Sequence, residues 1–166
     1  MRLSGKRIIE EKIITNVTPK AIQPQGVDVR VKEIREVIGT GQVTVDATYL
    51  PKYHLVEVST GVFGDKYYTL LPGKCYEVVL MEGFDIPNGR ALDFKTRSSL
   101  VRCGAIVESG QFDAGFKTKN GGCFIYVTNR IKIEVGARIA QAIVTETDLS
   151  EDLYDGQWQG DKQRKS

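Results

Sequence analysis

The sequence DFKTRSSLVRCGAIVESGQFDAGF, in the middle of the chain, gathers the side chains best suited to chemistry. Three cations, Lys95, Arg97 and Arg102, fall within eight residues of one another. The hydroxyl groups of Ser98 and Ser99 lie between these cations along the chain. Guanidinium groups and serine hydroxyls are natural partners of phosphate oxygens, so this stretch is a candidate phosphate-binding site.

A carboxylate follows the cations in a loop bounded by glycines. Asp113 lies between Gly110 and Gly115. A carboxylate beside a phosphate site can hold a water molecule for attack or bind the water shell of a metal ion. From the residue types alone, the favoured interpretation is still a solvated basic turn followed by an aspartate in a tight turn.

Other common chemistries lack their residues. The chain has one histidine, His54, and three widely spaced cysteines, Cys75, Cys103 and Cys123. Zinc sites need closely paired ligands, which are missing, and His54 in its strand-like surroundings is interpreted as an ordinary strand residue. The odd, widely spaced cysteines favour a reducing compartment over a disulfide framework. No GxxxxGK[ST] phosphate loop is present, and the segment Gly39–Gly41 is interpreted as a hairpin turn.

The composition is that of an ordinary globular protein. The chain of 166 residues is 41% hydrophobic and 27% charged, with a net charge of +2. Such a weak field argues against bulk electrostatic binding to nucleic acid. No apolar run is long enough for a membrane helix, and the charged start MRLSGKRIIEEK does not fit a signal peptide. We therefore expect a cytoplasmic protein without a nucleic-acid or membrane partner.

One segment near the start is predicted to be a helix. Ser4 can cap its N-terminus, and Ile8, Ile9 and Ile13 follow on one apolar face. The helix ends before Pro19, where the pattern changes to short β-prone runs.

The rest of the chain predicts short strands separated by turns. Ile131, Ile133 and Val135 alternate with polar residues, as in a strand with one buried face. The predicted strands are Val27–Val31, His54–Ser59, Tyr67–Leu71, Cys75–Met81, Cys123–Thr128, Ile131–Val135 and Arg138–Val144. Turns are predicted at Pro72-Gly73, Pro87-Asn88-Gly89 and Asn120-Gly121-Gly122. Many short, closely spaced strands indicate an all-β sandwich, jelly roll or partly closed barrel. We expect one β domain over residues 1–150 and a flexible C-terminal arm of the same domain over residues 151–166.

Five segments follow one another along the chain, namely PQGVDVRV, LLPGKCYEVVLMEGFDIPNG, TRSSLVR, GQFDAGF and VGARIAQAIV. In this order they resemble the superfamily of trimeric dUTPases and dCTP deaminases. The opening MRLSGKRI and the phrase LLPGK are most similar to the deaminase branch, including archaeal enzymes that handle both nucleotides. The likeness covers roughly residues 1–160. It implies a distorted β jelly roll with a short N-terminal helix, a homotrimer with active sites between subunits, and a deoxypyrimidine nucleoside triphosphate bound with Mg²⁺.

The resemblance also implies roles for individual residues. Asp113 matches the aspartate that positions the water attacking the α-phosphorus. Gln141 matches a glutamine near the phosphates, and the resemblance implies that Asp113 and Gln141 are the catalytic residues. Asp28 matches the aspartate near the magnesium–triphosphate assembly. The substrate-binding residues implied are the phosphate-holding Arg97, Ser98, Ser99 and Arg102, the deoxyribose-packing Phe116, and Trp158 of the arm, which either closes over the nucleotide or packs onto a neighbouring subunit.

The choice between hydrolysis and deamination depends on one general base. In the deaminases a glutamate follows the matching aspartate, on the next strand. Counting from Asp113 places that position at Cys123, and matching the strands by their ends places it at Tyr126. The segment KTKNGGCFIYVTN contains no acid, and the nearest carboxylates, Glu108 and Glu134, do not fit the position. Thiol and phenol are poor replacements for a group that must cycle protons near neutral pH. The sequence therefore predicts a dUTP diphosphatase.

Three alternatives stay open. The first is a dCTP deaminase, alone or coupled to hydrolysis, in which another residue replaces the missing glutamate. The second is a nucleotide-binding trimer without catalysis, although it would not need all the matching site residues. The third is a plain jelly-roll interaction domain, which would require the five matching segments to be a coincidence.

Overall fold

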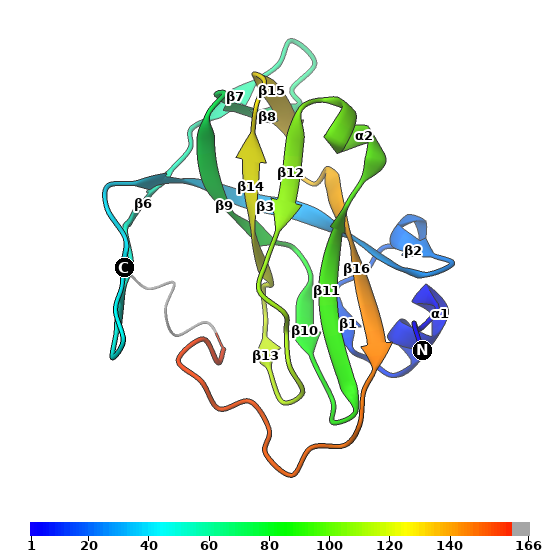
Figure 1. Ribbon diagram of the computed structural model, residues 1–166. Helices are drawn as coiled ribbons and strands as arrows, with labels where there is room; N and C mark the ends of the chain where they lie inside the picture. Colours follow the sequence, from blue (N-terminus) through cyan, green and yellow to red (C-terminus); the bar gives the residue numbers. More distant parts are fainter. Residues whose placement is uncertain (161–166) are drawn as a thin grey trace.

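The long strand β3, Gly26–Ile38, runs through the centre of the molecule and organises its main sheet (Figure 1). The computed structural model describes residues 1–160. The first half of β3 is buried on both faces, with Val27, Val29 and Val31 on one face and Gly26 and Asp28 on the other. Branched residues on a buried face are typical of a central strand.

The elements follow one another along the chain as many short strands and few helices. They are α1 (Gly5–Glu10), β1 (Ile14–Thr15), the 3-10 turn η1 (Pro19–Ala21), β2 (Ile22–Gln23), β3 (Gly26–Ile38), β4 (Gln42–Val43), β5 (Thr48–Tyr49), β6 (Lys52–Leu55), β7 (Val58–Thr60), β8 (Lys66–Leu70), β9 (Lys74–Leu80), β10 (Gly83–Asp85), β11 (Arg90–Thr96), α2 (Ser98–Arg102), β12 (Ala105–Glu108), β13 (Lys117–Thr118), β14 (Gly122–Val127), β15 (Ile131–Glu134) and β16 (Arg138–Glu146).

The main sheet has the strand order β11-β16-β3-β9-β14-β12, with β2 and β6 also paired to β3. Its two edge strands approach each other. The hydroxyl of Thr96 on β11 accepts a hydrogen bond from the amide of Val107 on β12 at 2.8 Å. Leu92 on β11 exchanges two backbone hydrogen bonds with Phe112, just after β12. The sheet is therefore nearly closed, which confirms the predicted all-β jelly-roll class.

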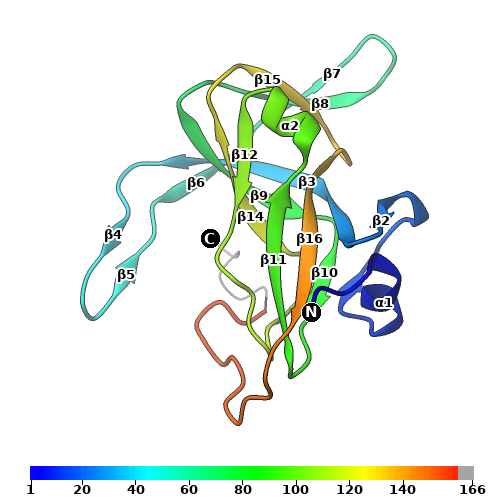
Figure 2. The ribbon, with the colours of Figure 1, turned by 45° about the vertical axis from the view of Figure 1, so that its right-hand side comes forward.

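Smaller sheets complete the molecule. The strands β1, β10 and β13 form one, and β15, β8 and β7 form another. The β4–β5 hairpin projects from the body of the protein, and the chain after β16 runs back beneath the sheet (Figure 2). Among residues 1–160, no helix is long and apolar enough to cross a membrane.

The predicted N-terminal helix is confirmed, and a second helix was missed. The Ser4 hydroxyl caps α1 by accepting from the amide of Arg7 at 3.2 Å, and Ile8 is fully buried. The second helix, α2, has only five residues and buries only Leu100. Its sequence was interpreted as a basic turn, because one buried residue in a single turn leaves no helical periodicity to detect.

Each predicted strand overlaps an observed strand, although β3 continues beyond the predicted Val27–Val31 to Ile38, and β11 and β12 were not among the predicted strands. The segment His54–Ser59 is interrupted, since β6 ends at Leu55 and β7 begins at Val58. The interpretation of Gly39–Gly41 as a hairpin turn is wrong, because β3 and β4 do not pair; β3 pairs with β6, and β4 pairs with β5. Of the predicted arm, residues 161–166 lie outside the described residues.

Candidate active site

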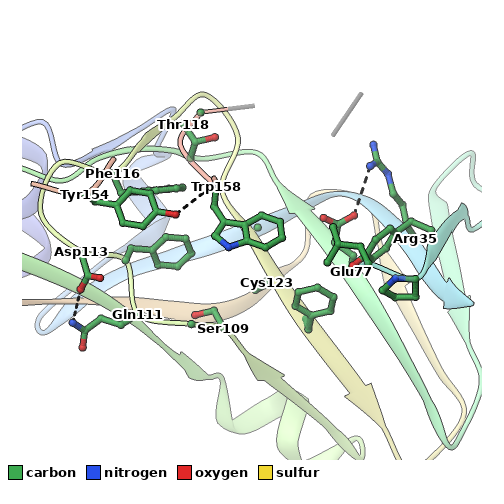
Figure 3. Close-up of a pocket in the computed structure, with 18 of the residues that line it drawn as sticks. Arg35, Glu77, Ser109, Gln111, Asp113, Phe116, Thr118, Cys123, Tyr154 and Trp158 are labelled. Carbon is green, nitrogen blue, oxygen red and sulfur yellow. Dashed lines mark hydrogen bonds and ion pairs between the residues drawn. The ribbon is translucent and has the colours of Figure 1, made fainter. Parts of the chain in front are cut away.

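Two pockets contain most of the chemically interesting side chains. The smaller pocket, about 240 Å³, is lined by residues of four strands and the start of α2, namely Gln23, Asp28, Lys95, Thr96, Arg97, Ser98 and Gln141. The larger pocket, about 830 Å³, contains Asp113 and is lined mainly by aromatic and small residues from several segments (Figure 3). The two pockets share no lining residue.

The register of three adjacent strands builds the smaller pocket. Asp28 on β3 lies opposite Gln141 on β16, and Gln141 lies opposite Lys95 on β11. Directly opposed residues project from the same face of a sheet, so these three side chains form one row. Arg97 and Ser98 follow at the end of β11, where the chain turns into α2. The row and the turn after it therefore bring together the carboxylate of Asp28, the amide of Gln141 and the cations of Lys95 and Arg97.

Asp28 is the anchor of this pocket. Its side chain is 4% exposed and pairs through Oδ2 with Arg138 Nη1 at 3.1 Å and Arg97 Nε at 3.4 Å. Burial raises the pKa of Asp28, and the charges of Arg97 and Arg138 oppose that rise. Arg138 also donates to the carbonyl of Lys20 at 2.7 Å. Two arginines thus converge on one buried carboxylate, which fixes the guanidinium group of Arg97 at the pocket.

Asp113 lies in the loop between β12 and β13 and is exposed. Gln111 donates through Nε2 to Asp113 Oδ1 at 2.8 Å, which orients the carboxylate (Figure 3). The loop is held at two points, because Phe112 pairs with Leu92 of β11 and the Gly115 amide donates to the carbonyl of Ile86 at 2.8 Å. An exposed, oriented carboxylate at the edge of a cavity can bind a water molecule.

Aromatic rings connect this loop to the core. Phe112 contacts Phe84, Phe94 and Phe116 with ring centroids 5.2–5.6 Å apart. Phe116 in turn contacts the ring of Tyr154 at 5.7 Å. Tilted and edge-to-face pairs of this kind add stability beyond burial alone. The loop carrying Asp113 therefore packs against the core through Phe112 and against the C-terminal arm through Phe116.

The C-terminal arm packs back onto the loop of its own chain. The amide of Tyr154 donates to the carbonyl of Ala114 at 2.8 Å. The side chain of Gln159 donates to the carbonyl of Gly115 at 2.8 Å and accepts from the amide of Lys117 at 2.9 Å. Trp158, whose amide donates to the Tyr154 hydroxyl at 3.2 Å, lines the larger pocket. The arm thus forms one wall of that pocket.

The predicted site residues divide between the two pockets. Asp28, Arg97, Ser98 and Gln141 come together in the smaller one. The larger one is lined by Asp113, Phe116 and Trp158. Ser99 and Arg102 are exposed on α2 and line neither pocket.

The two groups are separated along one strand. Asp113 follows Phe112, which pairs with Leu92, whereas Arg97 lies five residues beyond Leu92, just past the end of β11. At about 3.3 Å per residue, the two backbone positions are roughly 16 Å apart. Within one chain, the candidate water-binding carboxylate and the candidate phosphate-binding residues therefore open at different ends of β11.

Several residues of these pockets were missed by sequence reasoning. Arg138 and Gln23 contribute to the smaller pocket or its charge network, and Gln159 braces the loop of the larger one. Arg35 and Glu77 also line the larger pocket. The sequence was searched for an acid along β14. Glu77 lies instead on the neighbouring strand β9, opposite Phe124 of β14. Only strand pairing reveals this placement, and no local motif marks it.

Comparisons of the sequence with known proteins give consistent matches. The family model described as dCTP deaminase-like matches residues 4–147. A probable deoxyuridine 5'-triphosphate nucleotidohydrolase of Aeropyrum pernix is 31% identical over 164 residues, covering 97% of this chain and 99% of that protein. A protein of Methanosarcina mazei with the same name is 31% identical over 146 residues, covering 87% of this chain and 84% of that protein.

A solved structure confirms the fold. The crystal structure of 2'-deoxycytidine 5'-triphosphate deaminase from Agrobacterium tumefaciens superimposes with a TM-score of 0.65 and 15% identity, covering 88% of this chain. The chain spans about half the length of that deaminase, 48%. At this identity, the likeness concerns the arrangement of the strands.

Proposed function

The chain belongs to the dCTP deaminase-like family, and we propose that within this family it hydrolyses dUTP to dUMP and pyrophosphate. The relatives from Aeropyrum pernix and Methanosarcina mazei carry the name of a deoxyuridine triphosphate nucleotidohydrolase. The observation that carries the proposal is the oriented carboxylate of Asp113 at the edge of a cavity large enough for a nucleoside.

The residues of the two pockets divide the work of the reaction. Arg97, Ser98 and Lys95 supply the cations and hydroxyl that bind the triphosphate, and Gln141 adds an amide beside them. Asp113 orients a water molecule in line with the α-phosphorus. Gln111 occupies Oδ1 of Asp113, so we assign Oδ2 to the water. Asp113 accepts a proton from this water, the water oxygen forms the new bond to phosphorus, and the bond to the bridging oxygen breaks to release pyrophosphate.

Magnesium is part of this proposal. Magnesium in proteins is usually bound by one or two carboxylates together with substrate phosphates. Among residues 1–160, no three or more His, Cys, Asp and Glu side chains gather as a self-contained metal site. The smaller pocket has one carboxylate, Asp28, surrounded by cations. These residues fit an ion that arrives with the triphosphate, with Asp28 near its water shell. When bound, the ion screens phosphate charge.

We also propose that each complete site is shared between subunits of a homotrimer. The pockets of one chain share no lining residue and open at different ends of β11. Placing the smaller pocket of one subunit against the larger pocket of the next would bring Arg97 and Asp113 to the same substrate. A cyclic trimer repeats this contact three times and closes. Location in the cytoplasm is a further part of the proposal.

The proposal is tested by incubating the protein with Mg²⁺ and either dUTP or dCTP, and measuring pyrophosphate, ammonia and nucleotide products together. We expect dUMP and pyrophosphate from dUTP, without ammonia from dCTP. Asp113→Asn should lower kcat by about 10²- to 10⁴-fold, because the amide cannot accept a proton from water. Full activity of this variant would contradict the role assigned to Asp113.

dCTP deamination is the second candidate, because the matching family model is described as deaminase-like. The two positions that correspond to its general base are occupied by Cys123, which is buried, and Tyr126. Burial raises the pKa of the neighbouring Cys75 thiol, and the Cys75 side chain raises the pKa of Tyr126. A phenol whose pKa is raised holds its proton near neutral pH, so Tyr126 is unsuited to accept one from water. Release of ammonia from dCTP would favour the second candidate.

A further inference from the structure

The end of the larger pocket away from Asp113 contains an ion pair that the proposed reaction does not use. Arg35 Nη1 lies 3.6 Å from Glu77 Oε2 (Figure 3). The two residues are directly opposed on β3 and β9, and Glu77 is directly opposed to Phe124 on β14. They therefore project from one face of the sheet as a row of guanidinium, carboxylate and aromatic ring.

This ion pair is held in place. Arg35 Nε also pairs with Glu33 Oε1 at 2.6 Å, so the guanidinium group lies between two carboxylates. The side chains of Arg35 and Glu77 are 22% and 15% exposed. A planar guanidinium held on two sides keeps its remaining donors in fixed directions. The pair therefore presents a fixed donor beside a fixed acceptor to the pocket.

Aromatic surfaces separate the pair from the catalytic end. Figure 3 shows Trp158 between the Phe116–Tyr154 rings and the Arg35–Glu77 pair, and Phe124 also lines the pocket. A planar heteroaromatic group can stack on such rings while its edge makes hydrogen bonds beyond them. A ligand with its reacting phosphate at Asp113 would extend in this direction.

We propose that Arg35 and Glu77 recognise the polar edge of the pyrimidine base and determine substrate specificity. The inference rests on the proposed function. An ionised carboxylate accepts hydrogen bonds only, and a guanidinium group donates only. The uracil edge presents an N3–H donor beside carbonyl acceptors. Glu77 accepts from N3–H, and Arg35 donates to the adjacent O4 oxygen.

The experiment combines a change in the ligand with a change in the protein. Methylation of N3 removes the donor that Glu77 would accept. The Kd values of the non-hydrolysable α,β-imido analogue of dUTP and of its N3-methyl form are measured by calorimetry with Mg²⁺. The wild-type protein should bind the methylated form roughly 10- to 100-fold more weakly, the range for a hydrogen bond to a charged group. Glu77→Ala should weaken binding of the parent analogue by a similar factor and remove most of the methylation penalty.

Two further variants keep the test independent of folding defects. Glu77→Gln retains a carbonyl acceptor and should retain part of the methylation penalty. Arg35→Lys retains the charge but loses the planar fork, and should weaken parent binding while leaving the N3-methyl penalty in place. Glu134→Ala is the matched control, since Glu134 is an exposed strand residue on β15 that lines neither pocket. Thermal unfolding identifies any variant that has lost its structure.

The outcomes separate this inference from the proposed function. Equal methylation penalties in the wild type and in folded Glu77→Ala would overturn the inference, because contributions that add independently indicate no contact. Ammonia release from dCTP that is abolished in Glu77→Ala, with the methylation penalty unchanged, would also overturn it and make Glu77 a proton carrier. Binding is measured without turnover, so absence of dUTP hydrolysis would refute the proposed function while the binding result still decides the inference.

Discussion

The two pockets are constructed in different ways. The smaller one is a cross-strand row, with Asp28, Gln141 and Lys95 placed by backbone pairing of β3, β16 and β11. The larger one combines a loop, a strand face and the C-terminal arm, which are distant in sequence. The charges of the first are fixed by the sheet itself. The geometry of the second depends on side-chain contacts such as that of Gln159 with the loop.

This difference matches the tasks that we propose for the pockets. Phosphate is the common part of all nucleotides, and a rigid set of cations is sufficient to bind it. Discrimination between bases requires several convergent contacts, and water other than the attacking molecule must be excluded while the reaction proceeds. A pocket with a separate arm as one wall can supply the contacts to the base and can also exclude that water. Substitutions in the two pockets should therefore have effects of different size and kind.

The sharpest separation of the pockets comes from mixing subunits. Arg97→Ala and Asp113→Asn should each lower activity by about 10³-fold, since one removes a phosphate ligand and the other the water-orienting carboxylate. If sites are shared, refolding the two variants together at equal amounts should restore about a quarter of wild-type activity, because one site in four then combines two intact halves.

One outcome of the mixing experiment would contradict shared sites. Mixtures without recovered activity, from proteins shown to exchange subunits, would mean that both pockets of one chain serve the same substrate. The control is each variant refolded with itself, which must stay inactive. Recovery far above a quarter would indicate that one variant was only partly impaired.

The arm should have an intermediate effect that is confined to the larger pocket. Gln159→Ala removes two hydrogen bonds that brace residues 115–117, so kcat should fall roughly tenfold as Asp113 loses its fixed position. The inhibition constant of pyrophosphate, which reports on the smaller pocket, should stay unchanged. Gln157→Ala is the matched control, because Gln157 is exposed on the same arm. A large change in pyrophosphate inhibition would show that the arm also orders the smaller pocket.

The sequence predicted the smaller pocket better than the larger one, for a physical reason. Arg97 and Ser98 are adjacent in the chain, and Asp28 and Gln141 lie within recognisable segments, so a resemblance was enough to group them. The Asp28–Arg138 contact was missed, because a buried ion pair between strands has no local pattern. The all-β class was predicted from turns and alternation, whereas the pairing partners of β3 depend on contacts distant in sequence.

The larger pocket was only partly predictable. Asp113 and Phe116 were found in a single motif, and Trp158 was assigned to the site without a choice between its two roles. Glu77 was missed because the search for an acid followed β14, while the pocket face is shared with β9. A count along one strand cannot identify its neighbour. Register, which sets which side chains share a face, is a property of the whole sheet.

Substitution of Arg138, beside the smaller pocket, should have the smallest effect on activity. Arg138 is a positioning residue, since it contacts Asp28 and the carbonyl of Lys20 and does not line the smaller pocket itself. Arg138→Lys preserves the charge that opposes the rise in the pKa of Asp28. It loses the planar guanidinium group, whose Nη1 donates to both acceptors. We expect KM for dUTP to rise about threefold with kcat unchanged, as for loss of one ordinary hydrogen bond. Arg138→Met should raise KM further, because Asp28 then loses a charge partner and binds Arg97 alone. If Lys and Met give the same KM in steady-state assays, charge at this position is unimportant, and the sheet register alone holds Arg97 in place.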